Sequence, residues 1–512
     1  MTENDPKGQG MPYRSIIAGA DSAQADVAAA TSAATEAFAG FRATSPEARA
    51  DFLDAVAAEI EAARAEIVEA AVAESHLPEG RISGEVGRTT GQLKMFAGVV
   101  RRGDHLGVRI DPALPERTPL PRADIRQRQI PLGPVAVFGA SNFPLAFSTA
   151  GGDTVSALAA GCPVVVKGHP AHPLTGYLVA QAVTRAVEKA GLHAGTFSFL
   201  LDTDPAAGPQ TGIELGQSLV TDPRIKAVGF TGSRGGGLAI AAAAAARPEP
   251  IPVYAEMSSI NPVVILPGAL ATGDTDALAT AYVGSLTLGS GQFCTNPGLL
   301  FLPRSEAGDA FLAAAGRATA EAVGATMLTE GIAQAYEAGT EKLRSTDGVS
   351  VVGQGTAGDT DAPAPQLVEA ARLAGVTDEV FGASGVVVRY DSIDELLPSL
   401  DSLEGQLTAT VHATDADNEA AAQVVSALEL KAGRILFNGW PTGVEVGHAM
   451  VHGGPFPATS NSLTTSVGSL AIERFQRPVA YQDVPAAILP EAVRDDNPWH
   501  LARRIDGELQ LP

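Results

Sequence analysis

The sequence predicts an α/β fold that contains a Rossmann-type unit. From Gln129 onward, short apolar runs alternate with alanine-rich segments of helical period. β-Branched residues mark these runs as buried strands, and the runs cover 135–140, 163–167, 197–201, 227–230 and 251–257. Strands that alternate with helices at this spacing are typical of a parallel sheet with crossover helices.

Elements on both sides of this sheet extend the pattern. Upstream, one apolar stripe from Phe52 to Ile67 predicts a helix, and a second helix is predicted over 84–100. The segment 104–128 is rich in Pro and Arg, which favours an extended connection or an edge hairpin. Downstream, a second α/β unit is predicted from a strand at 261–267, helices at 277–288 and 306–323, an exposed loop at 353–365 and an extended tail from Arg477.

Composition indicates a soluble, cytoplasmic protein with no nucleic-acid or membrane partner. The 512 residues correspond to about three domains at roughly 150 residues each. The net charge of -23 repels phosphate backbones. The two cysteines, Cys162 and Cys294, fit a reducing compartment and not a disulfide framework. The polar start lacks a signal-peptide core, and no unbroken apolar run reaches membrane-spanning length.

A glycine-rich turn, FTGSRGGG at 230–237, follows a predicted strand and opens an alanine-rich helix. Glycines let the backbone approach a ligand, and a helix N-terminus offers free N–H groups to a phosphate. The turn therefore predicts a phosphate-binding site. The alternative is a strand-to-helix turn that binds nothing.

The two cysteines differ in context. Cys294 lies in the loop GQFCTNPG at 291–298, where a thiolate is a strong nucleophile once its pKa is lowered. A buried structural cysteine is the alternative. Cys162 leads directly into a buried strand, so we expect it to be structural.

Two further polar residues stand in apolar surroundings. Glu256 lies within an apolar strand, where burial either raises the pKa of its carboxyl or requires a partner. A raised pKa suits a general base, and a structural glutamate paired with a backbone donor is the alternative. Asn142 follows a strand end, where its amide could donate to an oxyanion or form an Asx turn.

A metal site is not expected. The histidines form no HExxH pattern, and His448 and His452 are four apart in a glycine-rich segment without helical period. Without a helix, this spacing does not place both rings on one face.

Taken in order, Asn142, Lys167, the FTGS turn, Glu256, Cys294 and the EVFG of 379–382 resemble the aldehyde dehydrogenase superfamily over nearly the whole chain. The stretch from Gly433 to Gln482 resembles the branch of NADP-preferring α-ketoglutaric semialdehyde (2,5-dioxovalerate) dehydrogenases, to which a fatty aldehyde dehydrogenase of luminous bacteria is related. The resemblance implies a Rossmann-type cofactor domain, an α/β catalytic domain and a β oligomerisation arm. We accordingly expect the cofactor domain over 1–110 and 132–258, the catalytic domain over 259–477, the arm from 111–131 and 478–497, and a tail over 498–512.

The resemblance also implies roles for single residues. Cys294 matches the nucleophile, Glu256 the general base and Asn142 the oxyanion donor. Lys167 matches a lysine that contacts the adenosine ribose. The remaining matches are Gly232, Ser233 and Gly237 in the phosphate turn, Glu379 at the nicotinamide ribose and Phe381 beside it.

Three departures from the family pattern bear on the site. Ser141 and Ala383 replace a Trp and a Pro that many members carry, which affects the local shape. Pro170 stands where NAD-preferring members often have a Glu. A carboxylate there would repel the 2′-phosphate of NADP, so NADP is the expected cofactor, with NAD possible. The expected phosphate partners are Lys167, His169 and Arg234.

The implied activity is oxidation of an aldehyde to an acid through a cysteine thiohemiacetal and a thioester. Three alternatives are a long-chain fatty aldehyde dehydrogenase, an acyl-CoA-dependent reductase, against which Glu256 argues, and a catalytically silent cofactor-binding scaffold. The resemblance implies that the helix at 84–100 lines the substrate funnel, where Arg88 and Gln92, which share a face with Phe96, could bind the carboxylate of α-ketoglutaric semialdehyde. The alternative for Arg88 is a surface ion pair. The extended arm segments predict a homodimer or homotetramer.

Overall fold

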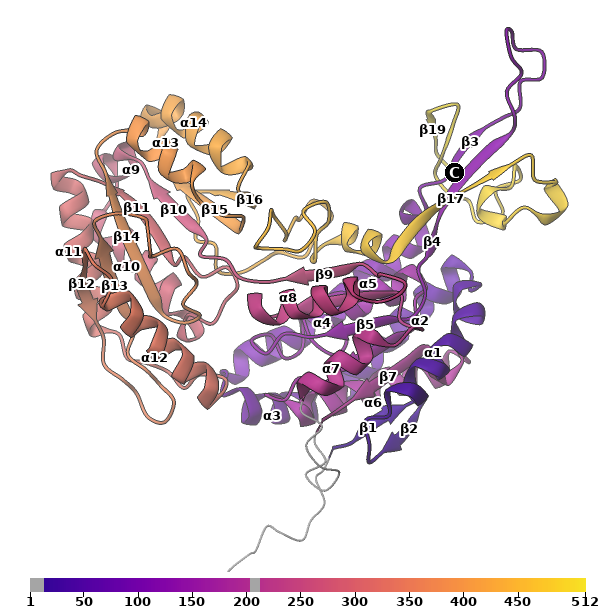
Figure 1. Ribbon diagram of the computed structural model, residues 1–512, viewed down its shortest axis with the longest axis horizontal. Helices are drawn as coiled ribbons and strands as arrows, with labels where there is room; N and C mark the ends of the chain where they lie inside the picture. The colour runs from indigo at the N-terminus through magenta and orange to yellow at the C-terminus, as the bar shows by residue number, and fades with distance from the viewer. Residues whose placement is uncertain (1–12, 203–211) are drawn as a thin grey trace, which may run out of the picture.

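The strands expected between 135 and 257 form one sheet in a computed structural model that describes residues 13–202 and 212–512 (Figure 1). The sheet order is β2-β1-β7-β6-β5-β8-β9. The strands β5, β6, β7, β8 and β9 run parallel to one another. The parallel sheet is therefore confirmed. Its strands are β1 Ser15–Ile17, β2 Ala20–Ser22, β5 Val135–Phe138, β6 Val164–Lys167, β7 Phe197–Leu200, β8 Ala227–Thr231 and β9 Val253–Glu256.

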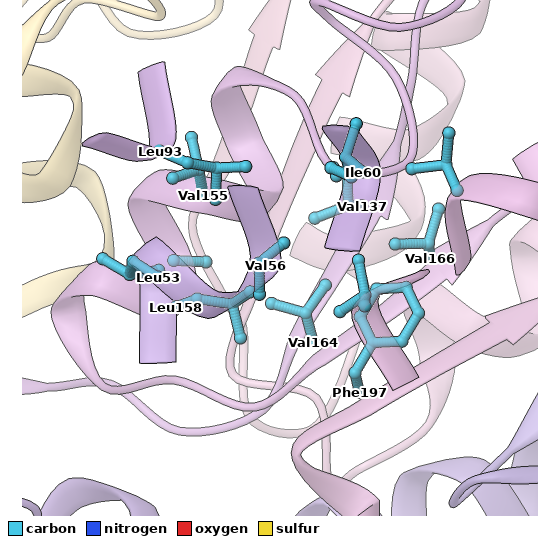
Figure 2. Close-up of a cluster of buried hydrophobic side chains, with 14 of the residues drawn as sticks. Leu53, Val56, Ile60, Leu93, Val137, Val155, Leu158, Val164, Val166 and Phe197 are labelled. Carbon is cyan, nitrogen blue, oxygen red and sulfur yellow. The ribbon is translucent and has the colours of Figure 1, made fainter. Parts of the chain in front are cut away.

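Alternate side chains of these strands supply two cores, one on each face of the sheet. Val137 and Val166 pack with Val56 of a helix on one face, as Figure 2 shows, whereas Phe138 and Val165 pack on the other. We call this three-layer unit the first lobe. Its helices are α1 Val27–Arg42, α2 Pro46–Ala62, α3 Arg64–Ser75, α4 Glu79–Arg102, α5 Gly152–Ala160, α6 Pro173–Lys189, α7 Gly212–Thr221 and α8 Arg234–Ala245.

The stripe from Phe52 to Ile67, predicted as one helix, belongs to two helices. The chain leaves helical geometry at Ala63, where φ is -96° and ψ is 9°, between α2 and α3. Both Phe52 and Ile67 are nonetheless buried in the same core. Neither a glycine nor a proline marks the break, so the apolar pattern continues across it.

The second half of the chain forms the second lobe, around a sheet of order β12-β13-β14-β11-β10-β15-β16. Helices cover both faces of this sheet, which lies at the left of Figure 1. Its strands are β10 Pro262–Ile265, β11 Leu299–Pro303, β12 Val349–Gln354, β13 Gln366–Ala370, β14 Ser384–Tyr390, β15 Gln406–His412 and β16 Ala432–Phe437. Its helices are α9 Pro267–Thr272, α10 Thr275–Thr287, α11 Glu306–Glu321, α12 Glu330–Arg344, α13 Ile393–Asp401 and α14 Asn418–Glu429.

A third sheet, of order β17-β4-β3-β18-β19, projects from the first lobe at the upper right of Figure 1. Its strands are β3 Arg109–Asp111, β4 Ile125–Pro131, β17 Gln476–Gln482, β18 Arg503–Ile505 and β19 Glu508–Gln510. The segment 498–512, expected as a separate tail, instead adds the β18–β19 hairpin to this sheet. Asp506 and Gly507 turn the hairpin with φ values of 51° and 84°, the Asp-Gly signal of a tight turn.

Across the described residues, no helix is both long and apolar enough to cross a membrane.

Candidate active site

The sequence-predicted site residues meet at the carboxyl ends of the first-lobe strands, facing the second lobe. Asn142 follows β5, Ser233 follows β8 and Glu256 ends β9. Together with Cys294 and Glu379 of the second lobe, they line a cleft of about 820 Å³. A cleft outside the carboxyl ends of parallel strands is where open α/β sheets bind ligands.

The Cys294 loop is held by a polar residue that the sequence did not reveal. Asn261 donates from Nδ2 to the carbonyls of Cys294 and Asn296, at 2.8 and 2.9 Å. Its own backbone lies in the left-handed region, with φ of 50°, and its N–H donates to Gln406 Oε1 at 3.1 Å. These contacts fix the loop to the second lobe at the start of β10.

His452 joins the nucleophile and the expected base. Its Nε2 lies 3.4 Å from Cys294 Sγ and 2.9 Å from Glu256 Oε1. The hydroxyl of Ser466 donates to the other Glu256 oxygen. Both His452 and Glu256 are buried, whereas His448 is exposed. A thiol, an imidazole and a carboxylate therefore share one small buried space.

The electrostatics of this cluster favour a protonated thiol beside an ionised carboxylate. Burial raises the pKa of Cys294 well above its usual value, Glu256 and Glu379 act in the same direction, and Arg434 opposes them. Burial also raises the pKa of Glu256, but His452, Ser466 and Arg474 outweigh it, so that this pKa is lowered overall. Glu256 is thus paired, as burial requires, by side chains and not by a backbone donor.

Asn142 is positioned by α4. Its Nδ2 donates to the carbonyl of Gln292 at 3.0 Å, which leaves its second amide hydrogen for another acceptor. Arg81 donates to the Asn142 carbonyl at 2.6 Å. Gln92, expected at the substrate, is buried and donates to the Ala146 carbonyl at 2.9 Å. The structure therefore gives the Gln92 amide a contact that supports the Asn142 loop.

The FTGS turn caps α8 as expected of a ligand-binding helix N-terminus. Ser233 is the N-cap, and its hydroxyl accepts from Gly236 N at 3.2 Å. Gly232 and Ser233 line the cleft. Gly237 instead allows close packing, because a Cβ there would lie 2.7 Å from the Met257 side chain.

Of the three expected phosphate partners, two already contact carboxylates and the third is a neutral histidine. Lys167 Nζ lies 3.6 Å from Asp202, which the sequence did not single out. Burial lowers the pKa of His169 to about 3, so its ring is neutral near pH 7. Arg234 forms an ion pair with Glu404 at 2.8 Å. Pro170 lines the cleft without a carboxylate.

The loop after β13 closes the far side of the cleft. Glu379 and Phe381 both lie in the cleft wall. Burial raises the pKa of the Glu379 carboxyl to about 8. A hydroxyl-rich ligand that donated to this carboxylate would favour its charged form.

A half-buried thiol, a buried carboxylate and an amide donor lie beside a Rossmann-type cleft, as in an oxidoreductase. Residues 12–455 match the aldehyde dehydrogenase family, and the chain belongs to this family.

Two relatives within this family are similar to the chain over nearly its full length. The chain is 52% identical to alpha-ketoglutaric semialdehyde dehydrogenase 2 of Azospirillum brasilense, covering 99% of this chain and 95% of the relative. It is 48% identical to alpha-ketoglutaric semialdehyde dehydrogenase of Acinetobacter baylyi, covering 94% and 91%. Among solved structures, gamma-glutamyl-gamma-aminobutyraldehyde dehydrogenase from Burkholderia cenocepacia superposes with a TM-score of 0.76 at 22% identity, covering 93% of this chain and 97% of that chain. This last likeness supports the fold.

Proposed function

We propose that this aldehyde dehydrogenase oxidises α-ketoglutaric semialdehyde to 2-oxoglutarate with NAD(P)+ as the hydride acceptor. The observation that carries the proposal is the contact of Cys294 with His452 and Glu256 at the end of the cleft. The names of the two relatives above 45% identity support the substrate.

In the first step, the proton of the Cys294 thiol passes to the adjacent His452, and the thiolate attacks the aldehyde carbon. The carbonyl oxygen becomes an oxyanion, which accepts from the free Asn142 amide hydrogen and from the Cys294 N–H. As the C=O bond re-forms, the carbon loses its hydrogen as hydride and remains bound to sulfur as a thioester. A nicotinamide held in the cleft near Glu379 and Phe381 would supply the hydride acceptor.

In the second step, Glu256 takes a proton from water, and the resulting hydroxide attacks the thioester carbon. The C–S bond breaks and the carboxylic acid leaves, the thiolate regains its proton from His452, and the proton that Glu256 took from water leaves to solvent. Because Glu256 is ionised, it can serve as a base near neutral pH. Covalent catalysis divides the oxidation into two easier steps.

The cleft fits a dinucleotide. Its volume is about 820 Å³, and it contains a capped helix N-terminus. We propose NADP as the preferred form because Pro170 places no carboxylate near the ribose. Of the three expected phosphate partners, Lys167 carries this preference, while Asp202 opposes it by pairing with the same ammonium group.

The deciding assay follows aldehyde-dependent NAD(P)H formation with α-ketoglutaric semialdehyde and with a long-chain aldehyde. We expect the larger kcat/KM for the semialdehyde. A larger value for the long-chain aldehyde would favour a fatty aldehyde dehydrogenase, and no turnover of either would favour a silent scaffold.

The projecting sheet supports assembly into a homodimer or homotetramer. β17 stands at its edge, and most of its residues are exposed or half-buried. An edge strand of this kind is stabilised by pairing with another chain. Light scattering at micromolar concentration is expected to give the mass of a dimer or tetramer, and a monomer would contradict this.

A further inference from the structure

Two arginines from different lobes hold the same short segment near the nucleophile. Arg434, on β16, donates from Nη1 to the Gly443 carbonyl at 2.9 Å and from Nη2 to the Pro441 carbonyl at 2.8 Å. Arg88, on α4, donates from Nη2 to the Val444 carbonyl. The two guanidinium groups thus reach adjacent carbonyls of one turn.

Neither guanidinium is in direct contact with a carboxylate among the described residues, although Glu85 and Glu445 act on the charge of Arg88 from farther away. Within residues 13–202 and 212–512, no carboxylate forms an ion pair with Arg88 or Arg434. Burial lowers the pKa of both side chains, and the charge of Arg88 adds to this effect at Arg434. The Nε of Arg434 is buried and has no hydrogen-bond partner. Two partly buried like charges without a directly bound carboxylate are costly, and an anion that bound both would lower this cost.

Arg88 lies beside the space that contains Cys294, and Arg434 is close enough for its charge to act on the Cys294 thiol. The Arg88 guanidinium stacks on the Phe147 and Phe143 rings, 5.0 and 5.6 Å from their centroids. These two rings line a small space that also includes Cys294. Arg88 also lines a second cavity of about 560 Å³, walled on its other side by 443–446. Glu445, in that wall, is exposed to solvent.

We propose that Arg434, together with Arg88, binds the carboxylate at the far end of an anionic aldehyde substrate. This assignment rests on the proposed function and gives Arg434 the place that the sequence suggested for Gln92. The main-chain contacts of both arginines orient their planar groups, and a planar guanidinium can bind a carboxylate through two parallel hydrogen bonds.

A competing role for Arg434 is activation of the thiol, because its charge also favours the thiolate of Cys294. The two roles differ in their dependence on substrate. Loss of a carboxylate contact affects charged aldehydes alone, whereas loss of thiol activation affects every aldehyde.

The test compares α-ketoglutaric semialdehyde with pentanal, which has the same number of carbons and no carboxylate. Arg434→Met is expected to raise the KM for the semialdehyde about 10- to 100-fold, with little change in kcat or in either constant for pentanal. Arg88→Met is expected to behave in the same way, and Arg434→Lys to restore part of the loss. Arg372→Met, at an exposed arginine, is the matched control.

A binding measurement separates this inference from the proposed function. Calorimetry of 2-oxoglutarate with Cys294→Ala enzyme, with and without Arg434→Met, needs no turnover, and we expect the second change to weaken binding by a similar factor. Unchanged 2-oxoglutarate affinity, or equal losses with the semialdehyde and pentanal, would overturn the carboxylate role. If wild-type enzyme ignores the semialdehyde while 2-oxoglutarate binding still depends on Arg434, the proposed substrate is wrong and the anion site stands.

Discussion

Arg81 binds the main chain of Asn142, donating from Nη2 to its carbonyl at 2.6 Å. The same guanidinium lies between two rings, 4.9 Å from the centroid of Phe143 and 4.8 Å from that of Phe293. One ring adjoins Asn142 and the other adjoins Cys294. Arg81 therefore connects the loop of Asn142, the proposed oxyanion donor, to the loop of Cys294, the proposed nucleophile.

Loss of the Arg81 contacts is expected to lower kcat more than it raises KM. Arg81→Met keeps an apolar stem but loses the hydrogen bond and the cation–π contacts. Because a small misplacement of reacting groups can cost about 100-fold, kcat is expected to fall about 10- to 100-fold with a small change in KM. Steady-state kinetics and thermal unfolding check this, and a proportional rise in KM with unchanged kcat would contradict it.

Substitution of the two cysteines should have opposite consequences. Cys294→Ala is expected to abolish aldehyde oxidation and retain cofactor binding, since the α8 N-terminus is untouched. Cys162 is buried, burial raises the pKa of its thiol to about 11, and its Sγ contacts the Phe475 carbonyl. Cys162→Ala should therefore turn over nearly as wild type does. Activity in the Cys294 variant, measured after anaerobic purification, would refute the mechanism.

Glu256 and His452 should affect different steps. Glu256→Gln removes the base for water, so kcat is expected to fall about 100- to 10,000-fold while a rapid burst of NAD(P)H persists. His452→Gln removes the imidazole beside the thiol, so the burst itself should become slow. Stopped-flow absorbance distinguishes the two. An abolished burst in the Glu256 variant would instead make Glu256 essential for thiol activation.

The preference for NADP over NAD should depend on Pro170 and Asp202. Pro170→Glu introduces a carboxylate and is expected to shift the kcat/KM ratio toward NAD. Asp202→Asn releases Lys167 and is expected to raise kcat/KM for NADP. Because His169 has a pKa of about 3, this preference should not vary between pH 6 and pH 8 through that ring. A wild-type kcat/KM that is higher for NAD would reject the NADP preference.

Buried neutral histidines should make the fold acid-sensitive. Burial lowers the pKa of His105 to about 3 and that of His412 to about 4, from 6.5. Below pH 6.5 these histidines bind protons in the unfolded chain but not in the folded protein. The free energy of unfolding therefore decreases as the pH is lowered. Each histidine contributes up to about 1.4 kcal/mol per pH unit. Urea unfolding at several pH values should show this slope, and His412→Phe should reduce it. An unchanged slope would exclude His412.

The sequence grouped the chemistry-bearing residues through their resemblance to the aldehyde dehydrogenase superfamily, since each local signal alone was weak. The structure places three of them, Asn142, Glu256 and Ser233, beside one cleft. The resemblance did not place His452 in the site, because this residue lies in a glycine-rich segment without periodicity and is 196 positions after Glu256 in the chain. Such a contact depends on tertiary packing, which no local pattern encodes.

The weakness of local sequence signals also explains smaller differences between the expected and the observed structure. The break at Ala63 has no sequence signal because alanine is a good helix former. The β18–β19 hairpin did have one, the Asp506–Gly507 pair, although its short strands are polar. Gly237 matches a ligand-binding motif, yet its close neighbour is Met257, so motif position alone does not show which glycine faces the ligand.

The catalytic set is divided between bodies that could move. Glu256 ends a strand of the first lobe, Cys294 is tied through Asn261 to the second lobe, and His452 lies on the chain segment between β16 and β17, which passes from the second lobe to the projecting sheet. The rate of turnover therefore depends on how the two lobes are aligned. A tilt of one lobe against the other would leave both sheets intact and would still move Cys294 Sγ away from Glu256.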